Sequence, residues 1–341
     1  LLRGQCLTTV PRCCLRQYEH SPTTLSADGL PALLSNLKIS DFKEILKPIL
    51  VERVPGTKSH AKVKNVSSII SLKTSFIHQV YCADNFKSCT FASNNLYLVY
   101  LSAHYDSKWF SEGSFIGATD SAVPCAMMIH MAKSLQDQLK ALDSNLSLMF
   151  VFFDGEEALY QWTPTDSLYG ARHLANVWHS SPFPTDSKST THLHRIDLLV
   201  LLDLIGAQLV GIEENLTKLN LIIIKNKRVR YFKAKSTSAR IEDDHLPFLE
   251  KVLHVIPLPF PKGWHTLNDD ERQLDFDSIT DLTYIFIFFT LDYLHASTTD
   301  EITQDKLSDE SVVYCGSLFL VAVFLTAHYF RLVKLYRFSF D

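Results

Sequence analysis

The chain contains 341 residues, of which 46% are hydrophobic, and its formal net charge is −4. This length and composition supply enough apolar surface for a packed core in one large domain or two small ones. The mild charge and the lack of a basic stripe with interleaved aromatic residues exclude a nucleic-acid-binding function. The seven cysteines form no Cys-x-x-Cys pair, which excludes a zinc finger, so any zinc site must use histidine and carboxylate ligands.

Three sequons bear on the cellular compartment, whereas the first residues do not indicate it. Residues 1–30 have neither apolar periodicity nor an apolar leader, and we expect an irregular segment there. Sequons that begin at Asn65, Asn145 and Asn215 would accept glycans in a secreted chain. They favour the secretory pathway, with the protein lumenal or extracellular.

The apolar runs that follow predict alternating helices and strands. Helices are expected at 39–51, 122–135, 167–177 and 276–294, and buried strands at 96–101, 146–153, 198–202 and 252–256. Because strand and helix alternate along the chain, we predict an α/β fold with a mostly parallel sheet.

The C-terminal part of the chain has a different composition. Residues 297–311 form an acidic linker, residues 312–330 carry no charge, and residues 331–341 form a short basic tail. Nineteen uncharged residues are long enough to cross a bilayer, and the change from acidic to basic flanks agrees with the positive-inside rule. We therefore expect a C-terminal anchor with the catalytic domain lumenal or outside. The alternative is a late core helix.

An apolar strand that ends in three carboxylates is the first sign of a functional site. The run from Phe152 to Glu157 places Asp154, Glu156 and Glu157 at the carboxyl end of a buried strand. Like charges this close are unfavourable unless a cation lies among them. A metal ion is the natural ligand here, and a solvated acidic turn is the alternative.

Other predicted strand ends carry groups of the same kind. These are His104 and Asp106, Asp120, Asp203, and His265 beyond the last strand. Each alone is more often a helix cap or a core residue, but a parallel sheet brings such ends together in one crevice. Imidazole and carboxylate ligands are those of catalytic zinc, so the set predicts a zinc site.

Several strings in this region resemble animal glutaminyl-peptide cyclotransferases, a branch of the M28 zinc aminopeptidase fold. They are residues 104–108, 117–128, 152–158, 166–170, 201–207, 243–245 and 264–266, in order along the chain. The resemblance implies a three-layer α/β/α sandwich around a twisted, mostly parallel sheet, in a domain at 31–296. Residues 72–95 resemble nothing in the family and are treated as an atypical insertion.

The resemblance also implies a role for each candidate residue. Asp120, Glu157 and His265 are expected to hold one zinc ion, with Glu156 as the proton-transfer residue and Asp203 and Asp243 in an acid network. Trp162 and Trp264 match the aromatic walls of a substrate pocket, with Ile241 and Phe260 beside them. Glu242 matches the position whose backbone meets the substrate amide. Asp154 receives no chemical role and is expected to support the turn.

The implied activity is conversion of N-terminal glutamine in peptides and proteins to pyroglutamate with release of ammonia, by a catalytic domain that is a monomer. N-terminal glutamate is a second candidate substrate. One alternative is a two-zinc aminopeptidase, because His104, Asp106 and Asp203 add ligands for a second ion.

A further alternative is an inactive relative that serves as an interaction protein. The stretches 53–71 and 204–242 are shorter than in the family, which puts the scaffold in doubt. The family's disulfide is also in doubt, because Cys125 matches one half whereas Ala103 occupies the other position. We therefore expect Cys125 to be a thiol.

Overall fold

The computed structural model describes residues 37–68, 97–140, 146–208, 241–248 and 252–294. The predictions for 1–30, 72–95, 297–311, 312–330 and 331–341 lie outside these residues. Among the helices within them, none is long and apolar enough to cross a membrane.

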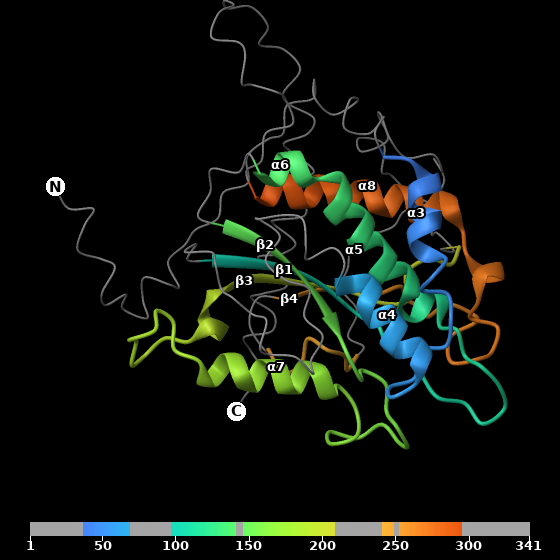
Figure 1. Cartoon of the computed structure of the whole chain (residues 1–341), viewed down its shortest axis with the longest axis horizontal. Coiled ribbons are helices and arrows are strands. Elements are labelled where there is room, and N and C mark those ends of the chain that lie inside the picture. Colours follow the sequence, from blue (N-terminus) through green and yellow to red (C-terminus); the bar gives the residue numbers. More distant parts are fainter. Residues whose placement is uncertain (1–36, 69–96, 141–145, 209–240, 249–251, 295–341) are drawn as a thin grey trace, which may run out of the picture.

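A sheet of four strands forms the centre of the described structure (Figure 1). Its strands are β1 (Tyr97–His104), β2 (Leu146–Phe153), β3 (Ile196–Leu202) and β4 (Val252–Val255). Their order is β2-β1-β3-β4, and all three pairings are parallel, which confirms the predicted topology. Every residue of β2 and β3 is buried, as expected for continuous apolar strands covered on both faces.

Helices cover both faces of the sheet and form the predicted three layers (Figure 1). The helices are α3 (Ile39–Leu46), α4 (Lys58–Ser68), α5 (Val123–Ser134), α6 (Gln136–Lys140), α7 (Tyr169–Ser180) and α8 (Phe276–Tyr293), with short helical turns η3 (Ala118–Ala122), η4 (His192–Arg195) and η6 (Glu271–Gln273). Buried residues of α3, α5 and α8 share one core cluster with strand residues such as Leu101 and Phe150. Buried residues of α7 pack with Tyr100 and Val151 in a second cluster. Adjacent strand residues thus enter opposite layers, because side chains alternate across a sheet.

Helix ends differ from the predicted ones where local chemistry intervenes. The helix predicted over 39–51 ends at Leu46, and Pro48, which has no N–H to donate, cannot continue its hydrogen-bond pattern. The N-terminus of α8 is capped by Asp275, whose side chain accepts from the Asp277 amide. The predicted core helix at 276–294 is otherwise confirmed.

The parallel pairing brings three strand ends to one edge of the sheet. His104 pairs with Phe153, and Ser102 pairs with Leu201, so the residues after β2 and β3 emerge beside the end of β1. Loops that follow the carboxyl ends of parallel strands form the ligand crevice of open α/β sheets. This edge therefore holds the candidate site.

Candidate metal centre and active site

Three of the predicted ligands come together from three separate loops. Asp120 lies in η3 between β1 and α5, Glu157 lies in the turn after β2, and His265 lies in the loop after β4. His265 Nε2 is 3.3 Å from Glu157 Oε1 and 3.6 Å from Asp120 Oδ2. One ligand atom from each residue lies within 4.8 Å of the other two. We call these residues the outer triad.

The outer triad fits a divalent cation. Asp120 Oδ2 and Glu157 Oε1 are buried and have no hydrogen-bond partner. Burial, together with the charge of Glu157, raises the pKa of Asp120 to about 7. A cation between the two carboxylates would provide a partner for the buried oxygens and would reduce the repulsion between the two charges. The set of two carboxylates and one imidazole is suited to zinc.

The backbone around Asp120 is fixed by its neighbours. Gly117 has φ +54°, and a Cβ there would lie 2.1 Å from the Asp120 carbonyl oxygen, so only glycine fits. Asp269 accepts hydrogen bonds of 2.9 Å from both the amide and the hydroxyl of Thr119. The fully buried guanidinium of Arg53 donates to the carbonyls of Tyr105 (2.8 Å), Gly117 (3.0 Å) and Asp120 (3.2 Å). The buried guanidinium of Arg53 therefore holds together distant parts of the segment that runs from β1 to α5.

The turn that carries Glu156 and Glu157 is held by Asp106. Its two carboxylate oxygens accept from the Glu156 amide at 3.1 Å and from the Glu157 amide at 3.2 Å. Burial alone would raise the pKa of Asp106, but contact with His104 and these amides hold it below its usual value. Lys108 Nζ binds Glu157 Oε2 at 3.1 Å, so the ligand carboxylate has a cation on the side away from His265.

Glu156 differs from its neighbour in its protonation. Burial raises the pKa of Glu156 well above its usual value, and the charges of Asp243 and Glu157 raise it further, although His104 opposes them. For Glu157, burial would raise the pKa, but contact with His265 and the charge of Lys108 outweigh it and lower the pKa. The two adjacent acids are therefore suited to different tasks: one exchanges a proton and the other remains a carboxylate.

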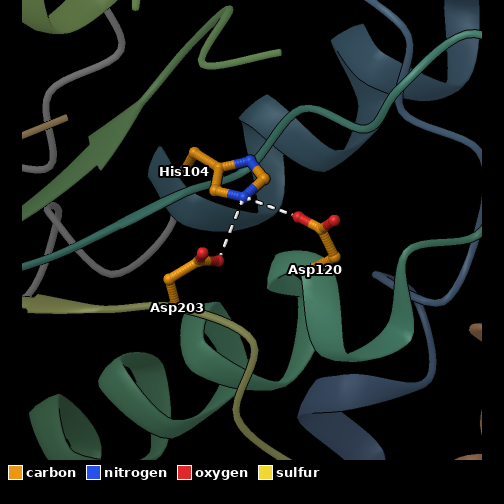
Figure 2. Close-up of side chains that lie close together, drawn as sticks. All are labelled: His104, Asp120 and Asp203. Carbon is orange, nitrogen blue, oxygen red and sulfur yellow. Dashed lines mark ion pairs between the residues drawn. The ribbon is translucent and has the colours of Figure 1, made fainter. Parts of the chain in front are cut away.

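A second group shares Asp120 and lies deeper in the crevice. His104 Nε2 lies 3.0 Å from Asp120 Oδ1 and 3.4 Å from Asp203 Oδ1. The imidazole ring lies between the two carboxylates (Figure 2). We call His104, Asp120 and Asp203 the inner triad, whose atoms also meet the spacing for a metal ion. Burial would lower the pKa of His104, but contact with Asp106, Asp120 and Asp203 raises it well above its usual value. The protonated ring then serves as the cation of this group.

The two acids predicted to form a network each have a partner of their own. The Ser121 hydroxyl donates to Asp203 Oδ1, and His254 Nε2 lies 2.7 Å from Asp243 Oδ2. Burial would raise the pKa of Asp243, but the hydrogen bond with His254 holds it below its usual value. Burial, with the charge of Asp243, raises the pKa of the adjacent Asp244 well above its usual value. The pKa values of these two adjacent carboxyl groups are therefore shifted in opposite directions.

Aromatic side chains lie over the outer triad. The Trp264 ring stacks on His265 with centroids 4.2 Å apart and planes at 19°, and Phe260 meets Trp264 edge-on at 4.7 Å. On the other predicted wall, Trp162 Nε1 donates to Glu242 Oε2 at 3.1 Å. The two tryptophans are 37% and 38% exposed, so they are not core residues. Ile241, next to Glu242, is half-buried.

Known proteins share both the sequence pattern and the fold of this chain. The sequence model of Peptidase family M28 matches residues 90–290. A glutaminyl-peptide cyclotransferase of Gloydius blomhoffii is 38% identical over 82% of this chain and 88% of the relative, and one of Bos taurus is 38% identical over 81% and 88%. The crystal structure of Macrostomum lignano glutaminyl cyclase superposes with a TM-score of 0.68 at 30% identity, covering 83% of this chain and 97% of that chain. The chain belongs to the glutaminyl-peptide cyclotransferases of peptidase family M28.

Membership of this family confirms the predicted fold and the resemblance on which it rested. Cys125, expected to be a thiol, is buried in the core cluster with α5. Its Sγ lies 3.1 Å from the His104 carbonyl oxygen.

Sequence reasoning missed several residues that shape this cyclotransferase site. Ser121 and Lys108 stand inside the strings that carried the resemblance, so their partners, Asp203 and Glu157, could have been sought there. His254 interrupts the apolar strand β4, which is a weak signal for a buried polar contact. Arg53 gave no signal, because the partners through which it reaches the site are backbone carbonyls far along the chain.

Proposed function

We propose that this protein is a zinc-dependent glutaminyl-peptide cyclotransferase that converts the N-terminal glutamine of peptides and proteins to pyroglutamate and releases ammonia. The observation that carries the proposal is a buried Glu156 whose pKa is raised, next to Glu157 of the outer triad, on whose His265 the half-exposed Trp264 stacks. The identity of about 38% with curated cyclotransferases over most of the chain supports the same activity. The protein is accordingly an acyl-transferring enzyme.

The reaction requires one proton to move between two nitrogen atoms of the substrate. The α-amine attacks the side-chain carboxamide carbon, a C–N bond forms to close the five-membered lactam, and the bond to the amide nitrogen breaks. Glu156 accepts the proton from the attacking amine and returns it to the departing nitrogen, which leaves as ammonia. A carboxyl group with a raised pKa suits this exchange because it holds a proton near neutral pH.

The outer triad is the proposed place of the zinc ion. Asp120, Glu157 and His265 would hold one ion, which when bound supplies a Lewis acid for the substrate carboxamide. Asp243 adds negative charge near Glu156. Asp203 and Asp243 are proposed to form the acid network that keeps the proton exchange near neutral pH. The inner triad contains its own cation in protonated His104, which supports one ion per chain.

The aromatic residues are proposed to hold the bent substrate and to exclude water. Trp264 is fixed by stacking on His265 and by the edge of Phe260, so its face is presented at a constant angle to the outer triad. Trp162 is oriented by Glu242, with Ile241 beside it. The backbone of Glu242 is the proposed contact for the substrate's amide. Ordered walls of this kind favour intramolecular attack over hydrolysis.

One assay tests the activity and its metal dependence. The purified protein is incubated with a peptide that begins with glutamine, with and without a zinc chelator, and the products are analysed by mass spectrometry. We expect loss of ammonia from the peptide, abolished by the chelator and restored by added zinc. Peptide that stays unchanged under all conditions would favour the inactive relative.

The two-zinc aminopeptidase is the rival with a specific observation in its favour, because the inner triad also has metal-ligand spacing. Metal analysis and product analysis separate the two proposals. Two zinc ions per chain, together with release of free amino acids, would replace the cyclotransferase proposal.

The location of the protein and its domain limits are further parts of the proposal. We propose a catalytic domain at 31–296 that resides in the secretory pathway, with residues 312–330 as a C-terminal anchor. Alkaline carbonate extraction of the native protein tests the anchor, since release into the supernatant would contradict it.

A further inference from the structure

Asp154, the third acid of the turn after β2, lies in a buried group away from both triads. Its Oδ1 is 2.7 Å from His60 Nε2, and its Oδ2 accepts a hydrogen bond of 2.7 Å from the Tyr105 hydroxyl. The rings of His60 and Tyr105 stack with centroids 5.0 Å apart and planes at 15°. All three residues are buried. We call them the Asp154 group.

The chemistry of the Asp154 group defines its hydrogen bonds. An ionised carboxylate can only accept, so His60 Nε2 must carry a proton and donate, as the tyrosine hydroxyl does. A buried carboxylate that lost either donor would be left partly unsatisfied. The group is therefore complete only while helix α4, which carries His60, and the end of β1, next to Tyr105, keep their present places.

The backbone of the same turn is bound by two other elements. Gly170 donates to the Asp154 carbonyl at 2.8 Å, Tyr169 to the Gly155 carbonyl at 2.8 Å, and Leu168 to the Glu156 carbonyl at 2.9 Å. These donors lie at the N-terminus of α7. On the opposite side, Asp106 accepts from the amides of Glu156 and Glu157. The Asp154 side chain adds the connection to α4.

The two glutamates depend on this backbone to different degrees. The Glu157 carboxylate has contacts of its own, with Lys108 at 3.1 Å and His265 at 3.3 Å. Among the described residues, the Glu156 carboxylate has no such side-chain partner in hydrogen-bond or ion-pair contact. Its location is therefore set by the backbone of the turn, so a change there is expected to move Glu156 more than Glu157.

We propose that Asp154, His60 and Tyr105 are positioning residues that fix the turn and thereby the carboxylate of Glu156. This inference rests on the proposed function, in which Glu156 carries the proton. It predicts that loss of a positioning residue slows turnover but leaves substrate binding and zinc binding unchanged. A general loss of structure would instead weaken all three. Buried groups that support catalytic residues typically change activity by about 10- to 100-fold when removed.

Tyr105→Phe is the sharpest test, because it removes only the hydroxyl. We expect kcat to fall about 10-fold, with KM within about 2-fold of the wild type and zinc content unchanged. A matched control is Tyr293→Phe. The Tyr293 hydroxyl also donates to a buried aspartate, Asp197, at 2.7 Å, but this pair lies near the start of β3, at the other end of the strand from the crevice. The control should leave kcat unchanged.

Two variants of His60 guard against a folding defect in Tyr105→Phe. His60→Gln keeps an N–H donor on a side chain of similar length and should retain kcat within about 3-fold, whereas His60→Leu should lose about as much as Tyr105→Phe. Rescue by glutamine but not by leucine supports positioning through Asp154. An equal fall in both His60 variants, or equal kcat in Tyr105→Phe and Tyr293→Phe, overturns the inference.

Amide hydrogen exchange gives a readout that needs no activity. In Tyr105→Phe, the peptide covering residues 154–157 should exchange faster than in the wild type, and in Tyr293→Phe it should not. Unchanged exchange in this peptide overturns the inference, whatever the enzyme does. A different result would overturn the proposed function instead. In that case the wild-type protein cyclises no glutamine peptide, although residues 154–157 exchange faster in Tyr105→Phe than in the wild type.

Discussion

The inner and outer triads share Asp120, yet they differ in what neutralises their acids. In the inner triad, His104 Nε2 lies 3.0 and 3.4 Å from two carboxylate oxygens, and its side chain is only 2% exposed. In the outer triad, the distances from His265 are 3.3 and 3.6 Å, its side chain is 28% exposed, and one oxygen of each acid has no hydrogen-bond partner. Similar residue types at similar spacing therefore make one internally paired group and one group suited to an external cation.

The surroundings of the two histidines explain this difference. His104 is the last residue of β1 and is buried, which would lower its pKa, but the surrounding acids raise its pKa well above the usual value. His265 lies on a loop near the surface, between Trp264 and Phe115. A proton on the inner imidazole occupies the position that a second metal ion would need, whereas the outer imidazole lies where a cation can enter from the surface.

The largest effect is expected from substitution of Glu156, the proposed proton carrier, which belongs to neither triad. Glu156→Gln removes the proton exchange but changes neither triad, so kcat should fall by about 10²- to 10⁴-fold while zinc remains bound. Steady-state kinetics with a glutamine peptide, together with metal analysis, measure both quantities. A variant that still cyclises at the wild-type rate would contradict the assignment of Glu156.

A pair of substitutions tests the comparison itself. Glu157→Gln removes a charged ligand of the outer triad, so the Kd for zinc should rise by at least about 100-fold. Asp203→Asn changes the inner triad by a similar loss of charge and should raise the Kd by less than about 10-fold. Competition with a chromogenic chelator measures both values. Equal losses in the two variants would mean that the inner triad also holds metal.

The sequence predicted the residues at the strand ends because parallel strands bring their carboxyl ends to one edge. The positions of Asp120, Glu157 and His265 relative to the apolar runs are enough to group them in this way. Their separate roles came from a family resemblance, not from spacing. Periodicity likewise placed the four strands and the α8 helix, because each is a long apolar run.

The supporting contacts could not be predicted by the same reasoning. Arg53 binds carbonyls of loops that lie 52 or more positions away, and backbone acceptors leave no mark in a sequence. His60 reaches Asp154 across 94 positions from a helix of low apolar content. Such contacts depend on how α4 and the loops are packed, which local patterns do not specify.

The smallest expected effect concerns an acid outside both triads. Asp292 lies near the end of α8, beside Tyr293, whose hydroxyl reaches the start of β3, away from the crevice. Burial alone raises the pKa of Asp292 to about 6, with no neighbouring acid contributing. We expect a raised pKa to affect catalysis only in the acids near the proposed metal ion and the proton exchange. Asp292→Asn should therefore leave turnover and zinc binding unchanged.

The stability of Asp292→Asn should depend on pH in a defined direction. The folded-state pKa is above the unfolded value of about 4, so the charged carboxylate destabilises the fold fully above pH 6 and not at all below pH 4. A shift of two units corresponds to about 3 kcal/mol, but Asp292 is partly exposed, and solvent screening reduces the expected gain to about 1 kcal/mol at pH 7. Urea unfolding at pH 7 and pH 4 measures the difference. A variant that is more stable by the same amount at pH 7 and pH 4 would show that desolvation of the charge is not the cause. A loss of turnover would give Asp292 a role that the two triads do not explain.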